Sequence, residues 1–375
     1  MWQTELSPVI FQSADFYGSK LVKTIKINTD PKISKIMNIE IFAQDAWKQK
    51  QQSIFSMITV PVIRRISDAL VMNCEFQLQQ ERIMEELKVA NFDLAIFEFN
   101  QCFAGMIELF HIPAHVMVSP TALFEYVTES IGVPNNPSYI PNLFTQYTDH
   151  MTYLQRAKNF VITLILNKLL NDITIRFQKL FRRLYGDKFV DLKEKLAQAT
   201  YVFTNSDPLF DISRPTIHKM MELGGLGLPK PQPLNKNWIT VINQRKATVL
   251  VSFGTIALSC WMPKETHTNL IAFITHGGMN SITEALNYGK PVIVAPIFGD
   301  QMQNAKLVER SGFGIRLSLS ELAIREKVQD AIHNIIYDKS YTRKAARLSK
   351  MIAKSLIQPR NSLLGMLNLL QNLVK

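Results

Sequence analysis

The chain has 375 residues, enough for two domains of ordinary size, and its 47% hydrophobic and 19% charged residues exclude a disordered protein. A net charge of +11 could indicate a nucleic-acid partner, but the basic residues are spread through predicted helices, without interleaved aromatic residues or zinc-finger spacing. We therefore expect no nucleic acid, and an anionic ligand or an anionic membrane surface would account for part of the excess charge.

Cysteine and metal-ligand patterns predict neither a disulfide nor a metal site. The 3 cysteines, Cys74, Cys102 and Cys260, lie far apart in the sequence and are odd in number, so we expect no disulfide framework and no zinc site. The D-x-D and H-E-x-x-H patterns are absent as well. We expect no metal ion and no bound cofactor.

The first half of the chain is predicted to be mainly helical, with a few strands. Short apolar runs predict strands at Leu94–Glu98, Ala114–Val118 and Tyr201–Thr204. The longest apolar stretch, Phe160–Leu170, contains Lys168 and is too short to span a bilayer. We expect it to be an amphipathic helix that packs against its own domain.

A segment rich in glycine and proline, Gly224–Pro233, is typical of a linker. We predict two domains, residues 1–228 and residues 229–375. In the second domain, Ser318 and Glu321 have the spacing of a capping box at the start of a helix. The apolar face of that one helix is expected to include Leu322, Val328, Ile332 and Ile335.

The most informative segment is Phe273–Ala305, which begins with a predicted strand, turn and helix. Phe273-Ile274-Thr275 is a short apolar strand, and His276-Gly277-Gly278 follows where the chain must turn. Ser281 and Glu284 have the spacing of a capping box. We expect them at the start and on the first turn of the helix.

The same segment continues into a second strand and helix. Gly289 is placed to end the first helix, Pro291–Pro296 predicts a buried strand, and Asp300 is placed to begin the next helix. Ligands of open α/β sheets bind beyond the carboxyl ends of the strands. We therefore expect the polar residues of both turns to form one site.

The chemistry of these turns suits the diphosphate and the sugar of a sugar nucleotide. Glycines let a phosphate approach the backbone, and a helix N-terminus offers free N–H groups. His276 can donate to a phosphate oxygen, and Glu284 can accept from ribose hydroxyls, while Asp300 and Gln301 can bracket sugar hydroxyls. Taken one at a time, the polar residues could be helix caps only. Their occurrence together on successive turns favours a ligand site.

These segments resemble the signature of the UDP-glycosyltransferase family, the animal-type UDP-glucuronosyl- and UDP-glucosyltransferases. The matching runs are FITHGGMNS, TEAL, GKPVIVAPIFGDQMQNA and the upstream VLVSFGT. Weaker matches in the first half are FDLAIFE, HIPAHVMVSP and TYVFTNSDP. The resemblance runs from about Phe92 onward. It implies the α/β fold called GT-B, in which two Rossmann-like domains face each other across a cleft.

The resemblance also implies where the diphosphate lies. His276 and Gly278 would contact it, and Ser252 or Thr255 would approach it from the end of the VLVSFGT strand.

The same resemblance implies the remaining contacts of the donor. Asn280 and Ser281 would line the phosphate and the acceptor side. Glu284 would hold the ribose, and Asp300 and Gln301 would hold the donor sugar.

Catalysis in this family uses a histidine near the chain start as the base, and a carboxylate orients it. Such a base needs a pKa near the working pH. No histidine precedes His111 here, so we expect the first strand and its histidine loop to be missing. Glu98 is then the candidate orienting acid, or simply a polar residue at a strand end. His111 and His115 are expected to be ordinary loop and core residues.

Two further departures are expected. The interval between Thr255 and Ile271 is too short for the elements that a doubly wound sheet normally places there. The family's uracil-stacking tryptophan segment would be missing, Trp261 would not replace it, and both domains would be incomplete. The resemblance implies an endoplasmic reticulum membrane location, but we find neither a signal peptide nor a membrane anchor in the sequence.

The function that the resemblance implies is inverting transfer of glucuronic acid or glucose from a UDP-sugar to a hydroxyl of a small lipophilic acceptor, as in detoxification. Membrane association or a family-type oligomer would accompany it. Apolar residues of the first half could line the acceptor pocket or be ordinary core: Phe99, Phe103, Phe124 and Tyr126. The alternatives are an inactive relative that only binds nucleotide or a partner, and a sugar-nucleotide epimerase, which does not account for the FGDQ-x-x-NA run.

Overall fold

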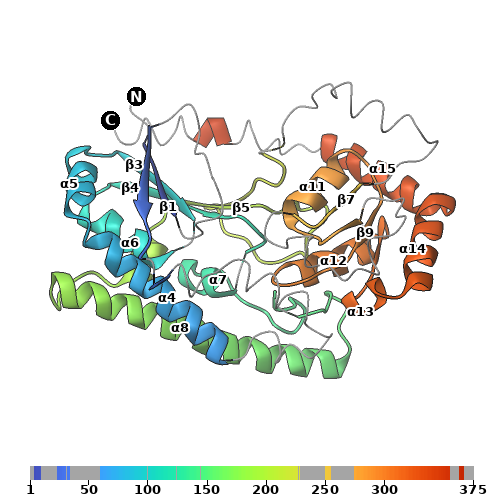
Figure 1. Cartoon of the computed structure of the whole chain (residues 1–375), viewed down its shortest axis with the longest axis horizontal. Helices are drawn as coiled ribbons and strands as arrows, with labels where there is room; N and C mark the ends of the chain where they lie inside the picture. Colours follow the sequence, from blue (N-terminus) through green and yellow to red (C-terminus); the bar gives the residue numbers. More distant parts are fainter. Residues whose placement is uncertain are drawn as a thin grey trace.

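The structure is a computed structural model. It describes residues 4–9, 23–30, 32–33, 60–98, 100–123, 125–143, 145–226, 228, 250–254, 274–354 and 363–366. These residues form an α/β protein with a four-stranded parallel sheet in each half of the chain (Figure 1). A separate pair of parallel strands, β1 (Thr4–Val9) and β2 (Lys23–Asn28), precedes them. The sequence predicted no strand in that part of the chain.

The sheet of the first half has the order β3-β4-β5-β6. Its strands are β3 (Leu94–Glu98), β4 (Ala114–Ser119), β5 (Tyr201–Thr204) and β6 (Met220–Glu222). The predictions of the first three are confirmed, whereas the short and only half-buried β6 was missed. The shorter helices of this half are α5 (Glu81–Val89), which precedes β3, and α6 (Gln101–Leu109), α7 (Glu125–Ile131) and α9 (Leu192–Ala197), which lie between the strands.

Apolar side chains of the strands and helices form the core of this half. Met117 of β4 and Val202 of β5 are each 1% exposed, and they belong to one cluster with Ile107 of α6, Val127 of α7 and Leu196 of α9. Burial of this cluster is what holds the helices on the sheet.

Two long helices, α4 (Val60–Leu78) and α8 (Tyr153–Tyr185), lie along this half of the molecule (Figure 1). The predicted amphipathic helix Phe160–Leu170 lies within α8. Ile162 and Leu166 are buried as expected, but Phe160 and Leu164 on the opposite face are 52% and 55% exposed. The prediction that the segment packs on its own domain therefore holds for one face only.

The prediction that the cysteines form no disulfide was wrong. Cys74 of α4 and Cys102 of α6 are joined by a disulfide bond. The two cysteines are 28 residues apart, and this spacing matches no sequence pattern that predicts a disulfide. Packing of the two helices around Phe181 and Leu180 brings the cysteines together.

The sheet of the second half has the order β10-β9-β8-β7. Its strands are β7 (Val251–Ser252), β8 (Ile274–Thr275), β9 (Val292–Val294) and β10 (Gly314–Arg316). Its helices are α11 (Met279–Asn287), α12 (Gln301–Ser311), α13 (Leu319–Leu322), α14 (Arg325–Tyr337) and α15 (Lys339–Ala353). The predicted strands at Ile274–Thr275 and within Pro291–Pro296 are confirmed.

Two predicted helix boundaries differ from the structure. Helix α11 begins at Met279 with Gly278 as its N-cap, so Ser281 and Glu284 do not form a capping box. The HGG turn already provides the helix start, and Ser281 falls inside the first turn. Gly289 does end the helix, with a left-handed φ of 60° that suits glycine.

The capping box at Ser318 and Glu321 is present, but it starts the short helix α13. The apolar face predicted for one helix is shared between α13 and α14, because the chain leaves the helical conformation at Ile324.

The two halves are packed against each other. Phe210 and Ile212, which follow β5, belong to the same apolar cluster as Val292 and Phe313 of the second half. Arg310 of α12 donates to the Phe210 and Asp211 carbonyls at 2.8 and 3.0 Å.

Candidate functional site

The candidate site lies where β7, β8 and β9 end and where α11 and α12 begin. Thr275 at the end of β8 and Val294 at the end of β9 are both 0% exposed, so these strand ends are anchored in the core. The register pairs Ser252 with Thr275 and Thr275 with Val294. The turns after the three strands are therefore neighbours, as the carboxyl ends of parallel strands require.

His276 lies over two glycines of adjacent turns. A Cβ atom at Gly254 would be 2.7 Å from the ring Cε1, and one at Gly278 would be 2.6 Å from Nε2. Gly254 also has a φ of 73°. No larger residue fits under the ring at either position. The ring and the glycine backbone thus form one surface.

Thr275 lies beside the imidazole ring of His276. The Gly277 amide donates to Thr275 Oγ1 at 3.3 Å, and the same Oγ1 lies 3.4 Å from His276 Nδ1. In the tautomer in which the threonine hydroxyl donates to Nδ1, the ring proton is on Nε2, which can then donate to a ligand. Burial lowers the pKa of His276, so the ring is neutral at pH 7.

The first turn of α11 has backbone N–H groups that face the end of the helix. The N-cap is Gly278, which has no side chain to accept from the N–H groups of Met279, Asn280 and Ser281. Asn280 Oδ1 accepts from Asn205 Nδ2 at 3.1 Å. Because Asn205 follows β5, this bond connects the site to the first half of the chain.

A buried amide links the two turns of the second half. Asn304 is 1% exposed, and its Nδ2 donates to the Gly277 carbonyl at 2.9 Å and to Asp300 Oδ2 at 2.8 Å. Burial raises the pKa of Asp300. Gln301 is 3% exposed and uses its Oε1 to accept from the Ile297 amide at 2.9 Å. Its side-chain NH₂ group is the part that remains for a ligand.

Most of the predicted donor residues are brought together. His276, Gly278, Asn280 and Ser281 lie at the start of α11. Asp300 and Gln301 lie at the start of α12, and Ser252 ends the neighbouring β7. Glu284 is exposed and lies on the second turn of α11, one turn further along than expected. Thr255 lies outside the described residues.

Sequence reasoning missed Gly254, Thr275 and Asn304 as members of the site. Gly254 belongs to the VLVSFGT run, and Thr275 directly precedes the histidine. Asn304 is four residues after Asp300, a spacing that places it one helical turn further on the same face. This spacing is a signal that the sequence did contain.

The first half places Glu98 at the exposed carboxyl end of β3, without a histidine from β4 beside it. His115 pairs in register with Ala95, further back along the strands. Its Nε2 lies 3.1 Å from the Lys195 carbonyl, and burial lowers its pKa to about 4. His111 has a φ of 52° in the turn before β4. The prediction that both are loop or core residues is confirmed.

Of the predicted acceptor-pocket residues, Phe103 packs partly buried against the core of the first half. Phe99, Phe124 and the side chain of Tyr126 lie outside the described residues. In the part of the chain that the structure describes, no group of His, Cys, Asp and Glu is placed to hold a metal ion. None of the helices described has both the length and the apolar composition needed to cross a bilayer.

Two parallel sheets that meet through their connecting segments, with polar turns at the strand ends, define the class of the protein. It has the GT-B fold of glycosyltransferases. The chain is similar to the crystal structure of the glycotransferase of kitacinnamycin, with a TM-score of 0.50 and 13% identity, covering 92% of this chain and 94% of that one.

The chain belongs to the UDP-glucoronosyl and UDP-glucosyl transferase family, whose model matches residues 13–268 and 257–362. It is 27% identical to UDP-glucuronosyltransferase 1A5 of Rattus norvegicus over 80% of this chain and 65% of that protein. It is 26% identical to UDP-glucuronosyltransferase 1A5 of Homo sapiens over 80% of this chain and 64% of that protein. The chain thus spans about two thirds of the length of these relatives.

Proposed function

We propose that the chain binds a UDP-sugar at the ends of β7, β8 and β9 and transfers glucuronic acid or glucose to a hydroxyl of a small lipophilic acceptor. The observation that carries the proposal is the arrangement of His276 over Gly254 and Gly278, beside the uncapped start of α11. A diphosphate placed there meets the Nε2 atom of the imidazole, the N–H groups of a helix start without a side-chain cap, and glycine backbone.

The sugar would lie toward α12. Asp300 and the NH₂ group of Gln301 offer an acceptor and donors at the start of that helix, and Asn304 holds the Asp300 carboxylate in place. Glu284, further along α11, is the proposed ribose acceptor, and Ser252 would approach the diphosphate from the end of β7. Thr255, which lies outside the described residues, is proposed for the same contact. The acceptor would enter from the first half, near Glu98. We propose residues 1–228 and 229–375 as the two domains.

A second candidate function is nucleotide binding without transfer. It is favoured by the position of His115, which is buried, bonded to the Lys195 carbonyl and far from the end of β3. Neither His115 nor His111 can serve as the base beside Glu98, so turnover would need another group to accept the acceptor proton.

The first test is the release of UDP when the purified protein meets UDP-glucose or UDP-glucuronate with a phenolic acceptor. We expect release above that of Glu284→Ala, a variant whose exposed side chain leaves the core intact. Release no greater than that of the variant contradicts transfer. Calorimetry with UDP then decides the alternative: binding without turnover supports the nucleotide-binding function, and no binding contradicts both functions.

We also propose that the chain folds in an oxidising compartment and associates with the endoplasmic reticulum membrane. The Cys74–Cys102 bond supports the compartment, because such bonds persist where thiols are not kept reduced. Maleimide labelling of the protein denatured directly from cells tests it. Labelling of Cys74 and Cys102 before reduction would contradict the proposal.

A further inference from the structure

Helix α15 carries a row of cations without matching acids. Arg343, Arg347, Lys350 and Lys354 follow one another at spacings of four, three and four residues, which places them on one face of the helix. All four side chains are exposed. The ion pairs found among the described residues involve none of them.

The helix itself supplies no carboxylate to balance this row, since Lys339–Ala353 contains no Asp or Glu. The acid at its start is Asp338. Its bonds to Ser340 hold its pKa low, and Arg343 and Lys344 contribute less. Asp338 is occupied as the N-cap and lies at one end of the row only. Most of the row therefore remains uncompensated.

The cations border a groove with apolar walls. A cavity of ≈ 790 Å³ is lined by the four cations together with Ala346 and Met351 of α15 and by Leu209, which follows β5. Leu209 and Met351 are each 39% exposed, although both are large and apolar. The groove thus combines a positive edge with hydrophobic surface that remains in contact with water.

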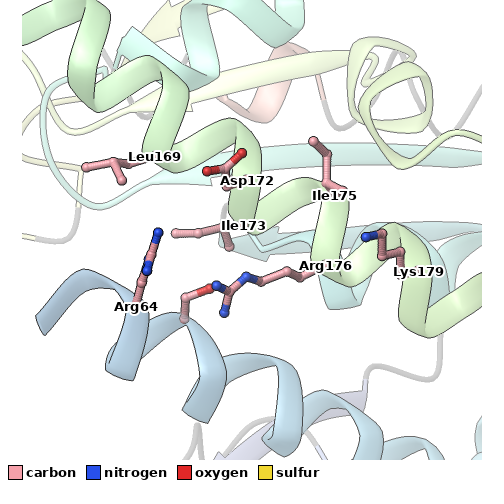
Figure 2. A pocket seen from close by; sticks show the side chains of 8 residues that line it. Arg64, Leu169, Asp172, Ile173, Ile175, Arg176 and Lys179 are labelled. Carbon is pink, nitrogen blue, oxygen red and sulfur yellow. The ribbon is translucent and has the colours of Figure 1, made fainter. Parts of the chain in front are cut away.

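A second cavity differs from this groove in its charge balance. It measures ≈ 210 Å³, lies between α4 and α8, and is lined by Arg64, Arg176 and Lys179 (Figure 2). Asp172 lines the same cavity, and Asp68 pairs with Arg176, so acids offset most of its positive charge. Among the residues that the structure describes, no acid lines the α15 groove.

We propose that the α15 groove binds an acidic, extended segment of a partner protein. The helix rises about 16 Å from Arg343 to Lys354 at ~1.5 Å per residue. An extended segment presents side chains on one face at intervals of ~6.6 Å, so three alternate acidic residues match the length of the row. The apolar residues between them face the opposite wall, where Leu209 lies. Opposite charge attracts the segment, and the apolar contact adds affinity.

Two other anionic partners fit the groove less well. Single-stranded nucleic acid uses aromatic side chains for base stacking, and no aromatic residue lines this groove in the part of the chain that the structure describes. A membrane surface meets a protruding apolar face, whereas Leu209 and Met351 lie within a groove.

The experiment measures fluorescence anisotropy of a fluorescein-labelled peptide of alternating glutamate and leucine, about seven residues long. We expect saturable binding that weakens as salt is raised. The double variant Arg347→Glu/Lys350→Glu should lose at least about tenfold in affinity. The matched control Lys158→Glu/Lys168→Glu makes the same charge change on exposed positions of α8 and should bind as the wild type does. Thermal melts by circular dichroism establish that both variants fold.

The apolar wall is tested separately with Leu209→Ser. This variant should weaken binding of the glutamate–leucine peptide and leave binding of a glutamate–serine peptide unchanged. Equal losses in the α15 variant and the α8 control would overturn the proposal, because net charge alone would then explain binding. So would α15-dependent binding of phosphatidylserine vesicles or of a single-stranded oligonucleotide when the peptide does not bind.

Discussion

Asn304 shows how one buried side chain can organise a ligand site. Its amide donates to Gly277 in the turn before α11 and to Asp300 at the start of α12. The turn proposed for the diphosphate and the acid proposed for the sugar are thus held at a fixed separation. Neither bond involves the ligand, so Asn304 acts as a positioning residue.

Asn304→Ala should weaken binding of a UDP-sugar by about tenfold and that of UDP by much less, because the Asp300 carboxylate loses its partner. Calorimetry with UDP-glucose and with UDP measures the two affinities. Asn287→Ala, which removes a half-buried amide on α11 that donates to the Thr283 carbonyl, is the control. An unchanged ratio of the two affinities in Asn304→Ala would contradict the positioning role.

His115 should make the stability of the protein depend on pH. Burial lowers its pKa from 6.5 to about 4 in the folded state, so the unfolded chain binds more protons between these values. The contribution of His115 to the free energy of unfolding is complete above pH 6.5 and is lost as the pH falls toward 4. Asp300 and Asp211 have raised pKa values through burial and act in the opposite direction, so the effect must be measured as a difference between variants.

Urea unfolding of His115→Gln tests this expectation, because glutamine keeps a donor for the Lys195 carbonyl but does not titrate. Between pH 6.5 and 4, the wild type should lose more stability than the variant. A parallel profile for wild type and His115→Gln would show that His115 titrates normally.

At the scale of elements, α8 organises the segment before it as well as the core. Asn159 is 0% exposed, and its Oδ1 accepts from the Asn142 amide at 2.8 Å. Its Nδ2 donates to the Pro137 and Ile140 carbonyls at 2.7 and 2.9 Å. One side chain on the first turns of the helix thus satisfies three backbone groups of a segment without regular structure.

Asn159→Ala should lower the free energy of unfolding by roughly 3 kcal/mol, because three buried backbone groups lose their partner. Asn171→Ala, at an exposed position of the same helix, should change it by less than about 0.5 kcal/mol. Denaturant unfolding followed by circular dichroism provides both values. Equal effects of the two changes would mean that water replaces Asn159 without cost.

Several of these elements could be predicted from sequence patterns alone. Strands β3, β4, β5 and β9 were predicted because each is a short run of apolar and β-branched residues, which is how a buried parallel strand is composed. The N-cap of α11 was predicted three residues too late, at Ser281 instead of Gly278. Ser281 and Glu284 match a capping box, but Gly278 and the packing of the HGG turn decide where the helix begins.

At the scale of the whole molecule, Arg310 joins the two halves. It donates to the Phe210 and Asp211 carbonyls and pairs with Asp149 at 2.9 Å. Phe210 also meets Phe313 edge to face, with ring centroids 6.0 Å apart. The helix that presents Arg310 begins at the proposed sugar site, so the same element connects that site to the first half.

Arg310→Ala should loosen the contact between the halves without unfolding either one. We expect faster amide hydrogen exchange around Phe210 and Asp149, because both lose their bond to the Arg310 side chain of the other half. Arg325→Ala, at the exposed start of α14, is the matched control. Exchange that is unchanged in Arg310→Ala would show that the apolar contact of Phe210 alone holds the halves together.

The sequence by itself determined the family and the order of strands and helices around the HGG and GDQ runs, and it supplied most of the residues that we propose for the donor site. It could do so because glycines, strand composition and polar residues at strand ends are local features. Only the tertiary structure decided the Cys74–Cys102 bond, the burial of His115 and the bond from Asn304 to the Gly277 carbonyl. These three features depend on contacts between segments far apart in the chain or on burial, and local residue spacing encodes none of them.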